Sequence, residues 1–243
     1  MGNGSFKKKA LPILNDAMFY ARSRLPLKST NKFYPDKRVI DKWKIKDPKR
    51  YSLHTESMDT EKIKKLNELR ALRMNPAQYC QRLDSDFNRG IKNAGNCGEN
   101  AMLAFSYLNK HVSELQRHAK DPVRILRIYL DMPVDHCLVL VGTFPDKGSA
   151  QLLENTLICD PWTKIVCPLN IYTSLWKAKM KKWSGRGLKG VHGGQTYDFY
   201  EDLCTRYSIY AGRVRIDEEA MHGIAMPVND NVRYSLMNRK VFS

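Results

Sequence analysis

The stretch Gly95-Asn96-Cys97-Gly98-Glu99-Asn100-Ala101 decides how the middle of the chain is interpreted. It ends a segment from Asp84 to Asn96 that is rich in Asn and Gly and is therefore typical of a loop. After it, apolar residues recur at steps of three and four, as on one face of a helix: Ala101, Ala104, Leu108, Val112 and Leu115. We therefore predict a helix from Cys97 to about His118, with the cysteine at its N-terminus.

Apolar runs downstream of this helix have the branched residues that are typical of β-strands. They cover Val123 to Leu130, His136 to Phe144, Leu152 to Asp160 and, more briefly, Ile165 to Cys167. The short links between them predict an antiparallel meander. His136 begins one run and Asp160 ends the next, so pairing of the two strands would bring these residues side by side.

The three polar residues at these positions suit nucleophilic chemistry. A cysteine attacks an amide carbonyl as its thiolate, and a helix N-terminus or a nearby histidine lowers the thiol pKa. We predict Cys97 as nucleophile, His136 as base and Asp160 as the carboxylate that orients the imidazole. Trp162, two residues after Asp160, is a candidate for contact with the substrate.

Three motifs in this order resemble papain-like bacterial effectors and toxins. They are Gly95 to Ala101, Asp135-His136-Cys137-Leu138-Val139-Leu140-Val141-Gly142 and Ile158-Cys159-Asp160-Pro161-Trp162. This group includes the YopT-like proteases and the glutamine deamidase domain of Pasteurella multocida toxin. The resemblance covers about residues 88–170, roughly a third of the chain.

The resemblance implies an α+β, papain-like fold in which the catalytic helix packs on an antiparallel sheet. It also implies a Cys-His-Asp triad, no metal or other cofactor, and a protein of the host cell as substrate. We expect a secreted virulence effector that works in the host cytoplasm. Glutamine deamidation is preferred, with a papain-like cysteine protease as the alternative. An acyltransferase or transglutaminase with the same triad, or a non-enzymatic basic binding module, also stays open.

The sequence defines the hydrogen-bond donors for an oxyanion less well than it defines the triad. The backbone N–H of Cys97 is one candidate, because it lies at a helix start. A papain-like enzyme would add a Gln side chain about six residues upstream, but this chain has Ile91 there. Asn93 and Asn96 are the candidate substitutes, and each is equally suited to forming a turn.

The formal net charge of +16 predicts acidic partners. The basic stretch from Lys177 to Lys189 is either a solvated helix face or a surface that binds an acidic protein or an anionic membrane. No nucleic-acid-binding motif accompanies the charge, so nucleic acid is not favoured. The sequence contains no run of 18 apolar residues, so no transmembrane helix is predicted. Its six cysteines form no CxxC pair, which fits a reducing compartment.

We predict a basic N-terminal extension over residues 1–60 and a catalytic domain over residues 61–243. Within the extension, Asp16 to Arg24 is expected to form a short helix and Lys32 to Lys49 an irregular arm. The remaining predictions are helices from Thr60 to Arg73, from Pro76 onward and from Asn170 to Trp183, a loop from Ser184 to Gly194 and a strand from Tyr207 to Ile216.

Overall fold

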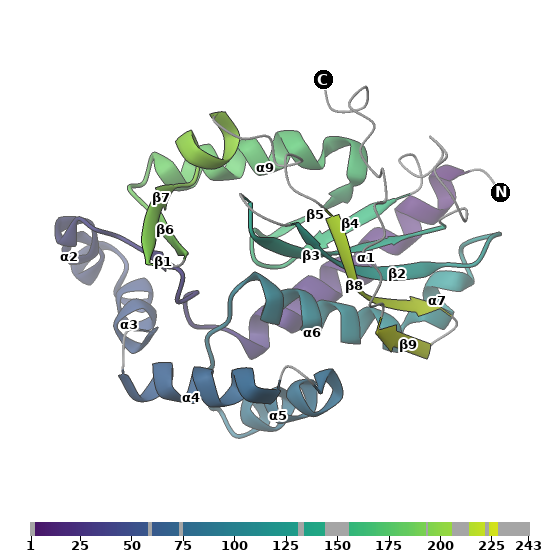
Figure 1. Cartoon of the computed structure of the whole chain (residues 1–243), viewed down its shortest axis with the longest axis horizontal. Coiled ribbons are helices and arrows are strands. Elements are labelled where there is room, and N and C mark those ends of the chain that lie inside the picture. Colours follow the sequence, from purple (N-terminus) through teal and green to yellow (C-terminus); the bar gives the residue numbers. More distant parts are fainter. Residues whose placement is uncertain are drawn as a thin grey trace. The chain divides into compact units, whose positions relative to one another are not determined.

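The computed structural model describes residues 3–57, 60–72, 75–130, 134–143, 156–192, 194–205, 214–221 and 224–227 (Figure 1). The chain forms two compact units. Unit 1 consists of Met1–Ala21, Cys97–Trp176 and Tyr207–Ser243, and unit 2 consists of Arg22–Asn96 and Lys177–Arg206. Both helices and antiparallel sheets are present, so the α+β class is confirmed. The division of the chain at residue 60 stays a prediction.

Unit 1 contains a six-stranded antiparallel sheet. Its strand order is β5-β4-β3-β2-β8-β9. The strands are β2 (Arg124–Leu130), β3 (His136–Gly142), β4 (Leu157–Asp160), β5 (Ile165–Pro168), β8 (Val214–Met221) and β9 (Ile224–Pro227). Every residue of β3 is buried, because this strand lies in the interior of the sheet between β2 and β4.

The meander predicted from the apolar runs is confirmed, since β2 to β5 pair with one another in chain order. The strand predicted from Leu152 begins, in the described part, at Leu157. Residues 144–155 lie outside the described residues. The late strand predicted from Tyr207 to Ile216 is described from Val214 onward, as part of β8, and residues 206–213 lie outside the described residues.

Helix α6 (Cys97–Lys110) packs on β2, β3 and β4. It begins at Cys97, as predicted, but it does not run unbroken to His118. The chain leaves the helix at His111, whose ring stacks on Tyr107 and bonds through Nδ1 to the Tyr107 carbonyl at 2.8 Å. A short helix, α7 (Val112–Gln116), then continues the apolar stripe.

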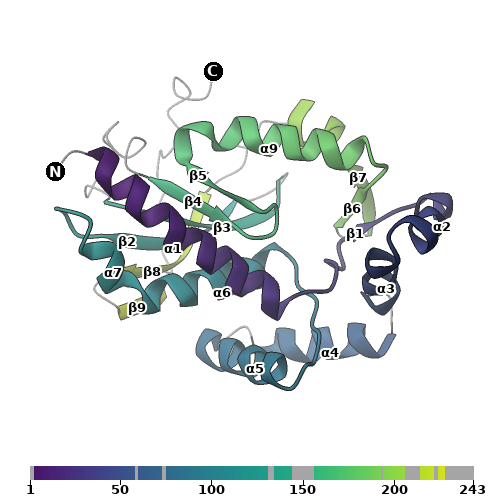
Figure 2. The ribbon, with the colours of Figure 1, turned by 180° about the vertical axis from the view of Figure 1, so that it is seen from behind.

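The N-terminal helix α1 (Asn3–Arg24) is much longer than the short helix predicted from Asp16. Its buried stripe consists of Ala10, Leu14, Ala17 and Ala21, each 0% exposed. Alanine contributes little to a hydropathy pattern, although its small side chain suits close packing of a helix on a sheet. The carbonyl of Leu14 accepts a contact of 3.5 Å from Cys159 Sγ on β4, and Figure 2 shows α1 crossing in front of the sheet.

Unit 2 is mainly helical. It contains α2 (Lys37–Lys46), α3 (Pro48–Ser57), α4 (Thr60–Ala71), α5 (Pro76–Asn88), the second half of α9 (Leu169–Ser184) and the π-helix η2 (Glu201–Thr205). A small antiparallel sheet has the order β1-β6-β7, with β1 (Lys32–Phe33), β6 (Lys189–His192) and β7 (Gln195–Asp198). The helices predicted from Thr60, Pro76 and Asn170 are therefore confirmed within a few residues.

Three loop predictions in unit 2 were wrong. The arm from Lys32 to Lys49 contains β1 and α2, and α2 begins after Asp36, whose carboxylate caps the helix by accepting from the Arg38 N–H at 3.0 Å. The segment from Asp84 is helical as far as Asn88. The Gly-rich loop from Ser184 contains β6, where Gly190 lies against the ring of Tyr197 and a Cβ would collide with it.

The burial of α1 gives a stability test. We expect Leu14→Ala to lower the free energy of unfolding by about 2–5 kcal/mol, because it leaves a cavity beneath the sheet. Phe19→Ala is the matched control on the same helix, since Phe19 is 74% exposed. It should change stability by no more than about 0.5 kcal/mol. Urea unfolding followed by circular dichroism measures both; equal losses would contradict the packing of α1.

Candidate active site

His136 and Asp160 meet at one end of the large sheet. His136 is the first residue of β3 and Asp160 the last of β4. These strands are antiparallel, with Val139 opposite Cys159. Continuing this register places Asp160 opposite Leu138, two residues from His136. Because side chains alternate along a strand, His136 and Asp160 project from the same face as diagonal neighbours.

The two side chains form a buried hydrogen-bonded pair. His136 Nε2 lies 2.9 Å from Asp160 Oδ2, and the side chains are 1% and 0% exposed. A carboxylate in such a place needs several hydrogen bonds to offset its loss of water. The sequence-based pairing of these residues therefore has a matching geometry.

Further donors surround the Asp160 carboxylate. Thr163 donates its backbone N–H to Oδ1 at 3.2 Å and its hydroxyl to Oδ2 at 2.5 Å. Tyr172, near the start of α9, donates its hydroxyl to Oδ2 at 2.8 Å. Burial alone would raise the pKa of Asp160, but His136, Thr163 and Tyr172 outweigh burial and hold it below its usual value.

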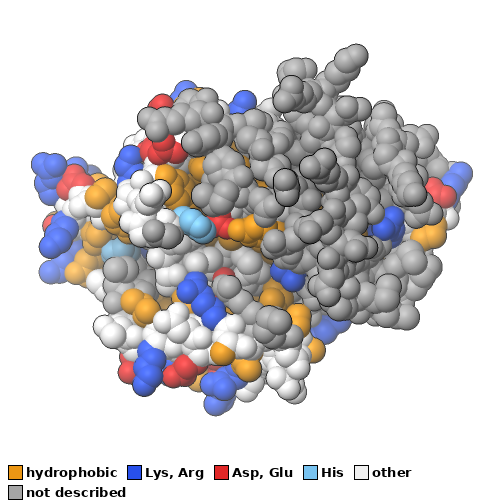
Figure 3. All heavy atoms as spheres, in the orientation of Figure 1, with side chains coloured by type: hydrophobic (Ala, Val, Ile, Leu, Met, Phe, Trp, Pro, Cys, Tyr) orange, Lys and Arg blue, Asp and Glu red, His pale blue; other side chains and the backbone are white. Residues whose placement is uncertain are grey.

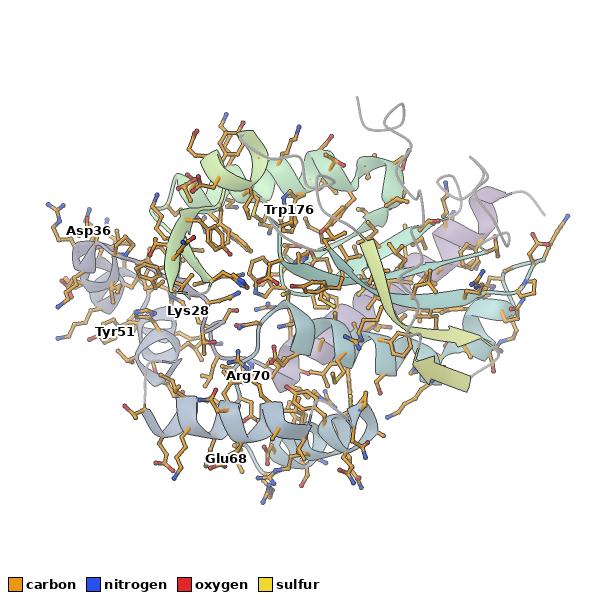
Figure 4. The ribbon with its side chains drawn as sticks, in the orientation of Figure 1. Lys28, Asp36, Tyr51, Glu68, Arg70 and Trp176 are labelled. Carbon is orange, nitrogen blue, oxygen red and sulfur yellow. The ribbon has the colours of Figure 1, made fainter. Side chains whose placement is uncertain are left out.

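Two tryptophans flank the imidazole of His136. The ring centroid of Trp162 lies 5.2 Å from that of His136, and the centroid of Trp176 lies 4.8 Å away. Figure 4 shows Trp176 beneath α9, on the side of the helix toward the end of β3. Both indoles are almost fully buried. They keep water from the imidazole, and both rings are tilted against it, by 43° for Trp162 and 46° for Trp176.

Cys97 approaches the pair from α6. It is the first residue of that helix and is 9% exposed. Its Sγ lies 3.8 Å from the carbonyl oxygen of Asp135. The thiol also acts on the neighbouring His136, whose pKa it helps to raise.

The protonation of His136 follows from its neighbours. Burial favours the neutral ring, but the charge and hydrogen bond of Asp160, together with Cys97, outweigh burial and raise the pKa of His136 to about 9. Nε2 is held by Asp160, and within the described residues the buried Nδ1 has no hydrogen-bond partner. Nδ1 is thus the ring nitrogen that Asp160 does not engage.

The backbone just before His136 has an unusual conformation. Asp135 has φ of 44°, in the left-handed region that Asp tolerates better than most residues. Its carboxylate accepts a hydrogen bond from the Tyr129 hydroxyl on the adjacent β2. This contact holds the turn whose carbonyl faces Cys97, so it helps to fix both the base and the surroundings of the thiol.

The candidate oxyanion residues lie in unit 2. Asn93 is buried, and its Nδ2 donates to Asp86 Oδ2 at 3.1 Å. The Oδ1 of Asn96 accepts from the hydroxyls of Ser29 and Thr30, at 2.7 and 3.3 Å. Both amides thus take part in hydrogen bonds within their own unit. Their role as oxyanion donors stays a prediction.

The basic stretch from Lys177 to Lys189 begins in α9 and ends in β6. Lys177, Lys181 and Lys182 are exposed, whereas Lys189 pairs with Asp198 at 2.8 Å. Across the described residues, no cluster of three or more His, Cys, Asp or Glu side chains is arranged to hold a metal ion. No helix in the same part of the chain is long and apolar enough to span a membrane.

Sequence reasoning missed three residues of this cluster. Thr163 and Tyr172 bind Asp160, and Trp176 covers His136. A threonine three residues after an Asp is a weak signal of a turn closed by the carboxylate. Tyr172 and Trp176 belong to the helix predicted from Asn170 to Trp183, but that prediction does not say which residues the helix covers.

Comparison of the chain with known protein families, with curated proteins and with solved structures finds no match.

The hydrogen bonds to Asp160 give a second test. Tyr172→Phe should lower the free energy of unfolding at neutral pH by about 1–3 kcal/mol, because a buried carboxylate loses a donor. The deficit should shrink in acid. The lowered pKa of Asp160 means that its charge stabilises the fold at neutral pH and stops doing so as pH falls through that pKa.

Urea unfolding at several pH values measures the free energy of unfolding that Tyr172→Phe loses relative to the wild type. Tyr51→Phe is the control, since Tyr51 is half-buried on α3 in unit 2 and should show neither the deficit nor its pH dependence. A deficit for Tyr172→Phe that stays constant from neutral pH into acid would contradict the role given to the Asp160 charge.

Proposed function

We propose that Cys97, His136 and Asp160 are the catalytic triad of a cysteine-dependent amide hydrolase with a papain-like fold. One observation carries the proposal: Nε2 of the buried His136 lies 2.9 Å from the buried Asp160 carboxylate, and Cys97, at the N-terminus of α6, helps to raise the pKa of this histidine. Such an arrangement suits nucleophilic catalysis by a cysteine, because Asp160 favours the charged ring that can later protonate a leaving group.

In the first stage, the Cys97 thiolate attacks the carbonyl carbon of the substrate amide. A carbon–sulfur bond forms and the carbonyl electrons move to the oxygen, where the backbone N–H of Cys97 is the candidate donor. The oxyanion then collapses and the carbon–nitrogen bond breaks. Nδ1 of His136 gives its proton to the leaving nitrogen, which departs as ammonia or an amine, and a thioester remains on Cys97.

In the second stage, neutral His136 takes a proton from a water molecule, whose oxygen attacks the thioester carbon. The carbon–sulfur bond breaks, the carboxylic acid leaves, and the thiolate–imidazolium pair returns. Throughout both stages Asp160 keeps the ring in one orientation, and Thr163 and Tyr172 keep Asp160 charged. No step requires a metal ion.

The preferred substrate is a glutamine side chain of a host-cell protein, and the preferred setting is that of a bacterial effector in the host cytoplasm. These assignments depend on the resemblance of the three motifs around Cys97, His136 and Asp160. A cysteine protease would use the same steps with a peptide amide, and a transferase would replace the water with an amine. The basic stretch from Lys177 to Lys189 is the proposed docking surface for an acidic protein or an anionic membrane.

The reactivity of Cys97 tests the nucleophile directly. We expect iodoacetamide at neutral pH to alkylate Cys97 at least about tenfold faster than Cys204, because only Cys97 has a helix terminus and a histidine beside it. Cys204 is half-exposed and serves as an internal control. Burial raises the pKa of Cys167 to about 12 and also raises that of Cys159, so both should react slowly. Peptide mass spectrometry gives the rate at each site.

His136→Ala should remove the excess reactivity of Cys97, and Cys97→Ser should abolish turnover while Cys204→Ser leaves it unchanged. A blocked glutaminyl-glycine peptide separates the reaction types. Release of ammonia indicates deamidation, release of glycine indicates proteolysis, and incorporation of an added amine indicates transfer. If Cys97 reacts no faster than Cys204 and His136→Ala changes nothing, the enzymatic proposal is wrong.

The pH profile tests the acid role of His136. Turnover should fall as pH rises through about 9, the raised pKa of His136, because a neutral ring cannot protonate the leaving nitrogen. Alkylation of Cys97 should persist above this pH, since it needs only the thiolate. A parallel decline of turnover and alkylation at high pH would contradict the assignment of His136 as the acid.

A further inference from the structure

The positive charge of the chain is concentrated in unit 2. The segments of unit 2 contain 26 Lys and Arg against 12 Asp and Glu, a formal net charge of +14. Those of unit 1 contain 15 against 13, a net charge of +2. On the face drawn in Figure 3, Lys and Arg side chains lie over α2 and over α4 and α5. Such an excess repels itself and attracts anions.

Within unit 2, three potentially cationic side chains surround Trp43. The Nζ of Lys28 and the Cζ of Arg50 each lie 3.9 Å from the centroid of the Trp43 ring. The Nζ of Lys28 is also 3.3 Å from Nδ1 of His54, whose ring meets Trp43 edge to face at 5.8 Å. Figure 4 labels Lys28 near the α2 and α3 helices.

The surroundings of Lys28 and His54 disfavour the protonated form of both side chains. Burial and the charge of Arg50 lower the pKa of Lys28 to about 7. Burial, Lys28 and Arg50 lower the pKa of His54 to about 4. Positive charge therefore acts on both groups. An anion bound among them would reverse this repulsion and draw protons onto the cluster.

The cluster also has hydrogen-bond donors to offer. Arg50 donates from Nη2 to the Tyr34 hydroxyl at 3.0 Å, and in the described part of the chain its guanidinium makes no other hydrogen bond. Most of the guanidinium fork thus remains for a ligand. When Lys28 is protonated it only donates, so His54 accepts at Nδ1 and carries its own hydrogen on Nε2.

We propose that Lys28, Arg50 and His54 form a binding site for a phosphoryl group, supplied either as free phosphate or by a phospholipid headgroup. A phosphate carries about −1.5 to −2 charges at pH 7 and three strong acceptor oxygens. It can accept from an ammonium and a guanidinium fork together, which a carboxylate with two oxygens does less completely. The half-buried positions of Lys28 and Arg50 leave both cations in reach of solvent.

Calorimetric titration of the full chain with inorganic phosphate tests the site without any need for catalysis. We expect binding that takes up protons near pH 7, seen as a heat that depends on the ionisation enthalpy of the buffer. Arg50→Gln should weaken phosphate binding by about tenfold or more, because it removes charge-assisted hydrogen bonds. Lys28→Gln should weaken it similarly and also abolish most of the proton uptake.

Lys64→Gln is the matched control. Lys64 is exposed on α4 and belongs to unit 2, so its removal changes the net charge by the same amount outside the cluster and outside the stretch from Lys177 to Lys189. It should alter phosphate affinity by less than about twofold, as expected for screened surface charge. Circular dichroism establishes that each variant is folded, and Lys28→Gln substitutes for Arg50→Gln if the latter is not. Equal losses in Arg50→Gln and Lys64→Gln, or no phosphate binding by the wild type, would overturn the proposal.

Vesicle co-sedimentation separates the two sources of the phosphoryl group. Binding to phosphatidylcholine vesicles that contain phosphatidylinositol 4-phosphate, with competition by free phosphate and loss in Arg50→Gln, would assign a lipid headgroup. Binding of free phosphate without binding of these vesicles would assign a soluble ligand. Equal binding to phosphatidylserine vesicles, reduced alike by Arg50→Gln and Lys64→Gln, would show a diffuse attraction and overturn the site.

Discussion

The carboxylate of Asp160 is fully buried, and the side chains at this end of the large sheet compensate for its loss of water. A buried carboxylate costs several kcal/mol unless hydrogen bonds and an opposite charge compensate for the lost solvent. His136, Thr163 and Tyr172 supply that compensation from β3, from the turn after β4 and from α9. These contacts connect three elements to the Asp160 carboxylate. The packing of this end of the sheet and the chemistry of the site therefore depend on the same two oxygens.

This constraint also explains the state of the histidine. A buried imidazole beside apolar rings would lose its proton, but the Asp160 charge reverses that tendency. The two flanking tryptophans exclude water without removing the charge partner. Cys97 begins a separate helix and is 9% exposed. The fold thus favours a protonated His136 beside a charged Asp160.

The two units differ in net charge as well as in structure. The unit that holds Cys97, His136 and Asp160 is nearly neutral, whereas the other carries most of the positive charge. In the basic unit, Lys28 and Arg50 both contact Trp43, so two like charges are held within reach of one indole. Aromatic contacts of this kind offset part of the repulsion between cations, and an anion would offset more.

The sequence by itself determined the start of α6 at Cys97, the meander from β2 to β5 and the order of the three polar residues along it, because strong local patterns specify these features. It did not determine α1 or α2, where alanines and charged residues hide the helical period. Only the tertiary structure decided that His136 and Asp160 share a face, since that depends on strand register. Tertiary packing alone also brought Thr163, Tyr172 and Trp176 to the pair, because nothing in a local pattern specifies what a buried side chain will meet.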